Sequence, residues 1–235
     1  MINSFNYKIN DLIIYEDKNI IVCNKPFGML SCKDKKAIDL DLFTIIKDTK
    51  NINNLSIINR LDRGVGGLII FSKNNKYTSI LTEYMKNHTF TKNYLAVTYN
   101  KAKDSDYLEN YLMKNQRLNI SKIVNKNSPN AKKAILSYKK LDEIQLQDKT
   151  YSLLDIDLKT GRHHQIRTQL SNANLPLYND IKYNKNLKRK IENNNLGLFC
   201  YKMSFLEPFT NKLLSFVVYP KDEKIFKQFK IIKDR

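Results

Sequence analysis

Short β-prone segments follow one another along most of this chain, and that succession limits the folds open to it. Residues 12–15 and 20–24 are apolar and β-prone, and the polar stretch 16–19 between them is typical of a turn. Segments with strand-like alternation outnumber segments with helical spacing, and most of them follow one another through turns. This order predicts an α+β fold with a central, mainly antiparallel mixed sheet flanked by helices and loops, rather than a doubly wound parallel sheet.

Periodicity also places the remaining elements. Further strands are expected at residues 67–71, 92–99, 134–141, 151–158, 198–205 and 213–218. Helices are expected at residues 40–48, 77–85 and 224–232, and a fourth is expected to start at residue 161. The lysine-rich stretch 100–133 is weakly patterned and is predicted to be a mobile basic excursion with short strands. Residues 184–195 are predicted to form an exposed loop.

The charge balance points to a polyanionic partner. The 235 residues include 41 lysines and arginines against 23 aspartates and glutamates, a formal net charge of +18. A nucleic acid is the natural partner of so basic a surface, although AT-biased coding would also enrich lysine without any function. The length fits one large domain or two small lobes that share a sheet. Because no long linker interrupts the pattern, we expect one domain over residues 1–235 with its core at about 12–220.

Cysteine usage and the N-terminal sequence indicate a cytoplasmic protein. Cys23, Cys32 and Cys200 are odd in number and lack CxxC spacing, so neither a disulfide framework nor a zinc site is expected. Residues 1–10 lack the apolar region of a signal peptide, and no apolar run approaches the roughly 18 residues of a membrane span. A monomer is the simplest expected assembly.

One aspartate stands out as a candidate catalytic group. Asp62 lies between Arg60 and Arg63, and a glycine-rich turn then leads into an apolar run. Flanking guanidinium groups favour the ionised carboxylate, which suits a nucleophile or a base. The alternative is a surface ion pair beside a glycine turn, and spacing alone leaves both interpretations open.

A second candidate segment spans residues 160–170. It follows an expected strand and opens an expected helix, where backbone N–H groups favour anions, so Arg162 and Arg167 are interpreted as clamps for phosphate or carboxylate. Two adjacent histidines, His163 and His164, do not suggest a metal site, because neighbouring side chains diverge on a helix. Helix capping with a solvated basic face is the open alternative.

The third candidate is Lys92 with Tyr94, two residues apart on one expected strand. An aromatic residue in such a strand is ordinarily part of the core or the sheet edge. The functional alternative is a ring that stacks on a nucleobase, with a hydroxyl group that can move a proton.

Together, in this order, these segments resemble the RluA-type pseudouridine synthases. The resemblance covers about residues 12–220. Its motifs are an Asn-Lys-Pro-x-Gly signature at 24–28, Asn-Arg-Leu-Asp-Arg at 59–63, the Lys92–Ala96 stretch, 160–167, and weaker signatures at 178–183 and 203–208. It implies isomerisation of uridine to pseudouridine in structured RNA, ribosomal or transfer, without cofactor or metal. Because the chain starts almost directly at the catalytic fold, we expect no S4-type RNA-binding domain.

The resemblance also implies roles for individual residues. Asp62 matches the essential aspartate, Arg167 the arginine that pairs with it, and Tyr94 the tyrosine that packs against uracil and helps to remove its C5 proton. Arg60 matches the arginine that occupies the space of the extruded base. Further contacts to substrate RNA are expected from Arg63, Lys92, Arg162, His164, Gln165 and Ile166.

Several positions depart from the family pattern. Asn59 replaces a usual histidine, 64–67 replaces a usual Asp-Thr-Ser-Gly, and Gln169 replaces a second histidine. None of these is Asp62, Tyr94 or Arg167, so catalysis is expected while the target uridine stays open. Two other function classes compete with this interpretation. One is an RNA-binding or ribosome-assembly factor that keeps the fold without catalysis, and the other is a carboxylate hydrolase, which lacks a second paired acid at a recognisable spacing.

Overall fold

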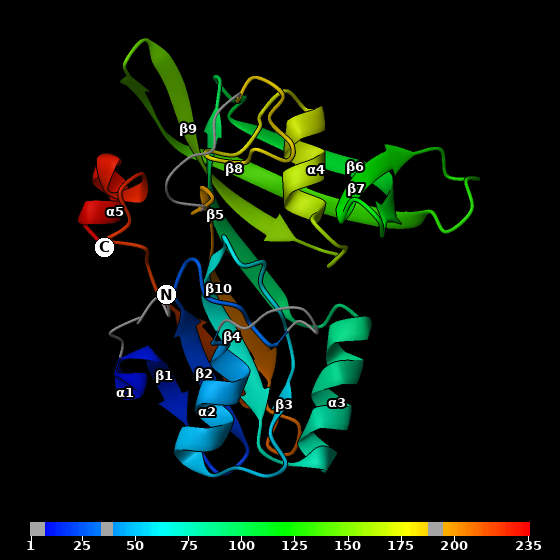
Figure 1. Ribbon diagram of the computed structural model, residues 1–235, viewed down its shortest axis with the longest axis vertical. Helices are drawn as coiled ribbons and strands as arrows, with labels where there is room; N and C mark the ends of the chain where they lie inside the picture. The colour runs from blue at the N-terminus through cyan, green and yellow to red at the C-terminus, as the bar shows by residue number, and fades with distance from the viewer. Residues whose placement is uncertain (1–7, 34–39, 188–194) are drawn as a thin grey trace. The chain divides into compact units, whose positions relative to one another are not determined.

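The computed structural model describes residues 8–33, 40–187 and 195–235, and the chain forms two compact units (Figure 1). The first unit comprises Met1–Phe90 and Lys202–Val218, and the second comprises Thr91–Tyr201 and Tyr219–Arg235. The prediction of a single domain over residues 1–235 stays a prediction. The predicted loop at 184–195 lies largely outside the described residues, as does most of the stretch 1–10 that was inspected for a signal peptide.

The first unit is built on a β-sheet. Its elements are α1 (Ile9–Leu12), β1 (Ile13–Glu16), β2 (Ile20–Lys25), α2 (Leu42–Lys50), β3 (Ser56–Ile57), β4 (Gly66–Ser72), α3 (Asn75–Lys86), the second part of β10 (Leu198–Leu206) and β11 (Leu213–Val217). β2 lies between β1 and β4 and pairs antiparallel with both, while β11 pairs antiparallel with β10. The expected hairpin of 12–15 with 20–24 is confirmed. β4 is buried along its whole length, as its apolar sequence predicted.

Side-chain caps explain where the two longer helices of the first unit begin. The Asp41 carboxylate accepts from the backbone N–H of Thr44, and the Asn74 amide oxygen accepts from the N–H of Tyr77. Each interaction satisfies a donor that a helix N-terminus leaves without a partner. Helices α2 and α3 therefore start within a few residues of the expected positions, 40 and 77.

The second unit is built on a second run of antiparallel strands. Its elements are β5 (Thr91–Tyr99), β6 (Ser105–Asn115), β7 (Ile120–Val124), β8 (Lys132–Leu146), β9 (Lys149–Leu158), α4 (Gln165–Asn172), the 3-10 helix η1 (Phe226–Gln228) and α5 (Lys230–Lys233). The strand order is β5-β9-β8-β6-β7, with every neighbouring pair antiparallel. The long hairpin of β8 and β9 turns at Gln147 and Asp148, whose φ angles of 48° and 59° are both positive, as a two-residue type I′ turn requires. The two units together confirm the α+β prediction.

Three sequence predictions for the second unit were wrong in detail. Residues 100–133 are not a mobile excursion with short strands, because β6 is 11 residues long and pairs with both β7 and β8. The helix expected from residue 161 starts at Gln165, and the helix expected at 224–232 is divided into η1 and α5 by the extended Phe229. In β6 the sequence signal was weak because polar residues, among them Asp106 and Asn110, occupy alternate positions that are partly covered.

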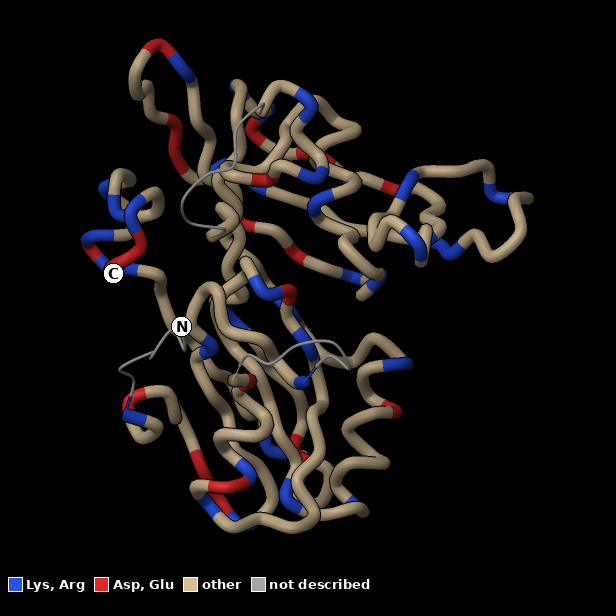
Figure 2. The backbone as a smooth tube through the Cα atoms, in the orientation of Figure 1, with Lys and Arg blue, Asp and Glu red and all other residues tan. Residues whose placement is uncertain are grey.

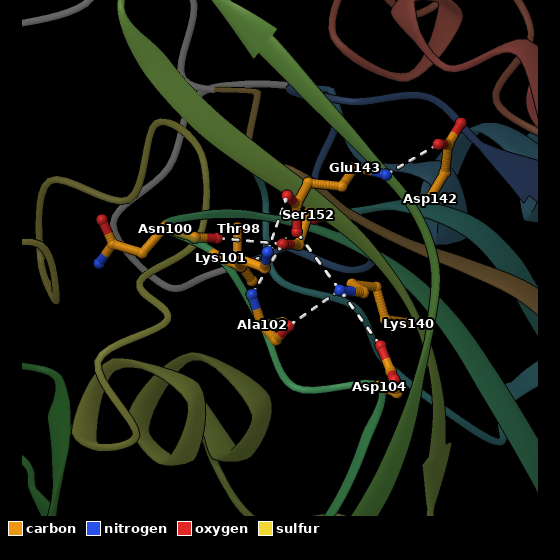
Figure 3. Close-up of polar contacts among 9 residues, drawn as sticks. All are labelled: Thr98, Asn100, Lys101, Ala102, Asp104, Lys140, Asp142, Glu143 and Ser152. Atoms are coloured by element: carbon orange, nitrogen blue, oxygen red, sulfur yellow. Dashed lines mark hydrogen bonds and ion pairs between the residues drawn. The ribbon is translucent and has the colours of Figure 1, made fainter.

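A polar network fixes the segment that leads from β5 into β6 (Figure 3). Lys140 Nζ donates to the carbonyl oxygen of Ala102 at 3.1 Å and lies 3.3 Å from carboxylate oxygens of both Asp104 and Glu143. Ser152 Oγ accepts from the backbone N–H of Ala102 at 3.0 Å. The start of β6 is therefore attached to β8 and β9 by several polar contacts.

Helix α4 covers one face of this sheet. Gln169 of α4 is 1% exposed, and its Nε2 donates to the backbone oxygens of Leu108 and Ala134 and to Asn110 Oδ1. Gln169 thus joins the helix to β6 and β8. In the described part of the chain, no helix is long and apolar enough to cross a membrane.

Candidate active site

Asp62 lies in the loop that leads from β3 into β4, and this loop is hydrogen-bonded to neighbouring segments on two sides. On one side, the buried Ser31 Oγ donates to the carbonyl oxygen of Leu61 at 2.7 Å and accepts from the Leu61 N–H at 3.0 Å. Within the loop, Val65 N–H donates to the Asp62 carbonyl oxygen at 3.0 Å. These bonds restrict the backbone of the residue that carries the carboxylate.

The other side of the loop contacts the turn after β2. Arg63 Nε donates to the carbonyl oxygen of Gly28 at 2.9 Å, and Gly28 N–H donates back to the Arg63 carbonyl oxygen at 2.9 Å. Gly28 has a φ of 79°, a conformation that residues with a Cβ rarely adopt, so this exchange depends on glycine. Asn59 is 8% exposed and bridges to β4, with Nδ2 donating to Leu68 O and Oδ1 accepting from Ile70 N–H. Asn59 therefore has a structural role here.

Lys25 is a buried cation for which the sequence predicted no role. Its side chain is 0% exposed, and Nζ donates to the carbonyl oxygens of Pro26 at 2.9 Å, Met29 at 2.8 Å and Arg63 at 3.4 Å. Burial lowers the pKa of Lys25 to about 7, while the charge of the Asp62 carboxylate acts in the opposite direction and that of Arg63 adds to the lowering. Lys25 thus lies within the electrostatic reach of Asp62 and supports the same loop.

Replacing Lys25 by methionine is expected to destabilise the protein, and increasingly so as pH rises. The substitution leaves three carbonyl groups without this donor, at a cost of about 1–3 kcal/mol for a buried polar group. Because the pKa of Lys25 is lowered in the folded state, the unfolded chain binds more protons above pH 7, and the wild-type free energy of unfolding rises from about pH 7 toward pH 10. Lys25→Met lacks this rise, so its deficit in melting temperature grows between pH 6 and pH 9.

Thermal melts of Lys25→Met, wild type and Lys18→Met at several pH values measure this effect. Lys18 is an exposed lysine of the same unit and serves as the control. A deficit for Lys25→Met that shrinks as pH rises would contradict the assignment of a lowered pKa to Lys25.

In the second unit, Lys92 and Tyr94 lie on β5 and are 4% and 8% exposed. Their side chains lie on the face of the sheet that α4 covers. Tyr94 is paired with Ile156 and Ile156 with Tyr138, so these side chains share one face. Across the pairing of β8 with β6, Asn110 lies on the same face, and it contacts Gln169 of α4. Burial lowers the pKa of Lys92. The second and third candidate segments therefore meet on one face of this unit.

Arg167 of α4 forms a buried ion pair within the second unit. Its Nε donates to Asp180 Oδ2 at 2.7 Å and its Nη2 to Asp180 Oδ1 at 2.8 Å, in the two-bond geometry typical of arginine and carboxylate. Asp180 is 0% and Arg167 7% exposed. The guanidinium also lies over the ring of Tyr183, 5.1 Å from its centroid. Asp180 and Tyr183 thus orient Arg167, and the expected pairing of Arg167 with Asp62 stays a prediction.

The adjacent histidines are arranged differently from the helical geometry that was expected. His163 and His164 precede α4, and their rings stack with centroids 3.8 Å apart instead of diverging. The cause is the backbone of His164, whose φ of 51° places it in the left-handed region before the helix starts. His164 Nδ1 lies 2.9 Å from the Tyr183 hydroxyl, and His163 Nδ1 lies 2.9 Å from Ser121 Oγ.

The other residues of this segment bind the chain to itself. Gln165 accepts from Thr160 Oγ1 at 2.8 Å and from Arg162 N–H at 3.0 Å, and Arg162 Nε donates to Lys133 O at 2.9 Å. Gln165 and Ile166 are buried. In the first unit, Arg60 and Arg63 are exposed and Asp62 is half-buried. The RNA contacts predicted for these residues stay predictions.

Three residues that contact or lie near the candidate residues of their own unit had no assigned role from sequence. Lys25 lies inside the Asn-Lys-Pro-x-Gly signature, as the cation that ends a largely apolar strand, and Asp180 and Tyr183 lie inside the weaker signature at 178–183. Asp180 is 13 residues from Arg167 in a loop, so no local periodicity connects them. Among the described residues, no group of three or more His, Cys, Asp and Glu side chains is placed to bind a metal ion.

Residues 19–172 match the family model described as RNA pseudouridylate synthase. The chain belongs to the RluA-type RNA pseudouridine synthases. Relatives of this synthase include the tRNA pseudouridine synthase C of Haemophilus ducreyi, 29% identical over 84% of this chain and 86% of that protein. Another is the ribosomal large subunit pseudouridine synthase C of Rickettsia bellii, 33% identical over 74% of this chain and 56% of that protein. Family membership makes the protein an isomerase that acts on RNA.

The fold agrees with this family. The solved structure of human RNA pseudouridylate synthase domain containing 1 superposes with a TM-score of 0.75, covering 94% of this chain and 88% of that one. Sequence identity in that comparison is 18%, so the likeness concerns the fold.

Proposed function

We propose that this pseudouridine synthase isomerises a uridine of transfer or ribosomal RNA in the cytoplasm, with Asp62 as the catalytic carboxylate. The observation that carries the assignment is the set of contacts that hold the loop of Asp62. Its loop is bound by Ser31 on one side and by Gly28 on the other, with the Lys25 ammonium within electrostatic reach. A carboxylate on a restrained loop suits attack or proton abstraction at one defined position of the ribose.

The proposed reaction breaks one bond and forms another without net change in composition. Asp62 either attacks C1′, so that a bond from its carboxylate oxygen replaces the N1–C1′ bond, or removes a ribose proton as the N1–C1′ bond breaks. The uracil then rotates and C5 bonds to C1′, which releases the carboxylate in the first route and takes the proton back onto the ribose in the second. The proton on C5 then leaves with the help of the Tyr94 hydroxyl, and N1 gains a proton. Arg60 fills the space of the extruded base, since flipping a stacked nucleotide costs a few kcal/mol and leaves a gap.

Arg167 is proposed to provide a fixed positive charge for this reaction. Asp180 binds its Nε and Nη2 and so holds the guanidinium in one orientation, and its charge is proposed to act on a second anion, either the Asp62 carboxylate or a substrate phosphate. Lys92, Arg63, Arg162 and His164 are proposed to contact the RNA around the target nucleotide.

The RNA class is decided by pseudouridine-specific chemical mapping of total RNA from cells with and without the protein. Loss of a pseudouridine from transfer RNA would identify transfer RNA as the substrate, and loss of a pseudouridine from ribosomal RNA would identify ribosomal RNA. The relatives carry names of both kinds. Restoration of the lost site by adding purified enzyme to RNA from the deficient cells would attribute it directly. An unchanged map of both RNA classes would contradict the proposal.

A further inference from the structure

A basic groove lies at one edge of the second unit, between β7 and the segment that follows α4. It has a volume of about 600 Å³. Three lysines and several asparagines line it, and they include Lys122, Lys182, Lys185, Asn172, Asn174 and Asn186. None of the described residues that line the groove is acidic. Its polar surface therefore offers positive charge and amide N–H donors, which are the groups that phosphate oxygens accept from.

The three lysines of this basic groove are exposed. Within the described ranges, no ion pair joins any of them to an aspartate or glutamate. Lys182 Nζ donates to the carbonyl oxygen of Asn119 at 3.4 Å, so it crosses from the segment after α4 to the turn between β6 and β7. The positive charge of the groove is thus not neutralised by neighbouring carboxylates.

The arm formed by β6, β7 and their turns, residues 105–133, extends this positive surface. Residues 110–133 contain no aspartate or glutamate and six cations: Lys114, Arg117, Lys122, Lys126, Lys132 and Lys133. All six are exposed, and Figure 2 shows Lys and Arg distributed along the arm. Of the six, Lys133 pairs with the Glu109 carboxylate at 2.9 Å, and a run of exposed cations with so few opposing acids is the electrostatic pattern of a nucleic-acid contact.

The basic groove is structurally connected to Arg167. Tyr183 lines the groove, and the Arg167 guanidinium lies over its ring. The Tyr183 hydroxyl accepts from the backbone N–H of Ser121 at 2.6 Å, which joins the groove segment to β7. A ligand in the groove would therefore lie directly beside the residues that orient Arg167.

We propose that this basic groove binds the phosphodiester backbone of the substrate RNA, outside the target uridine. This proposal rests on the proposed function, because that function identifies the RNA as the substrate. The place of contact is inferred from the groove itself. Three lysines that neutralise phosphates release bound counterions from the RNA, so binding must depend on salt concentration. Sequence choice is not expected from these contacts, because phosphates are the same at every nucleotide.

The test compares Lys122→Gln/Lys182→Gln/Lys185→Gln with Lys221→Gln/Lys224→Gln/Lys227→Gln. Both variants remove three exposed lysines of the second unit, so the loss of net charge is the same. Binding of a synthetic RNA stem-loop is measured at several KCl concentrations in an Asp62→Asn background, where no turnover is expected. The groove variant should bind about 10- to 50-fold more weakly at about 0.15 M KCl, with the slope of log K against log [KCl] smaller by about 2. The control should change by less than about 3-fold.

Equal losses in both variants, or no loss in the groove variant, would overturn the proposal, because binding would then follow overall charge. Replacement of the same three lysines by arginine should keep binding within about 3-fold of the parent, and a loss as large as that of the glutamine variant would also overturn it. Since no turnover is needed, an unchanged pseudouridine map would refute the proposed function and leave this binding result standing.

Discussion

Asp62→Asn is expected to lower the rate of pseudouridine formation by about 10³-fold or more while RNA binding stays within about 3-fold of wild type. Asparagine has nearly the shape of aspartate but neither its negative charge nor its nucleophilic oxygen. The bonds of Ser31 and Gly28 to the loop involve backbone and neighbouring side chains, so they persist in the variant. The loss should therefore appear in the single-turnover rate at saturating RNA.

Asp48→Asn is the matched control for this experiment. Asp48 is an exposed aspartate of α2 in the same unit, and the chemical change is identical. Thermal melts of both variants separate loss of chemistry from loss of folding, since Asp62 also acts on the charge of Lys25. A rate for Asp62→Asn equal to that of wild type, on an RNA that wild type modifies, would show that another group carries the reaction.

Asp180→Asn is expected to lower the free energy of unfolding by about 3–5 kcal/mol, the usual cost of removing one partner of a buried ion pair. Asp180 is fully buried and Arg167 is 7% exposed, so the guanidinium cannot turn to water when the carboxylate is lost. The melting temperature should fall by about 10 °C. Because Asp180 orients Arg167 on two nitrogen atoms, the rate at saturating RNA should fall as well.

A double-mutant cycle tests whether Asp180 acts through Arg167. Arg167→Met combined with Asp180→Leu should be more stable than Asp180→Leu alone, because no unpaired charge then stays buried. Asp157→Asn is the control, since Asp157 forms an exposed ion pair with Lys159, which contributes at most about 1 kcal/mol. If the double variant were as unstable as the sum of its single variants, the two residues would be independent.

Periodicity predicted the parts of the fold in which one face is clearly apolar. The hairpin at 12–15 and 20–24 and the buried strand at 67–71 were confirmed. Every residue of β4 and five of the six residues of β2 are buried, so their apolar character is visible in the sequence. The prediction was wrong for residues 100–133, where strand pairing with β8 gives order to a polar sequence. The start of α4 was predicted four residues too early. The left-handed backbone of His164 delays the helix, and the spacing of apolar residues does not predict that conformation.

The sequence by itself determined the class of fold and the family, because alternation and ordered motifs are local patterns along the chain. It also singled out Asp62, Tyr94 and Arg167 as candidates for the reaction. Only the tertiary structure decided that Lys25 is buried with a lowered pKa, and that Arg167 pairs with Asp180. Likewise, only folding brings Lys122 and Lys182 to one groove across 60 residues of chain. Burial and charge pairing depend on which distant segments surround a side chain, and no local pattern contains that information.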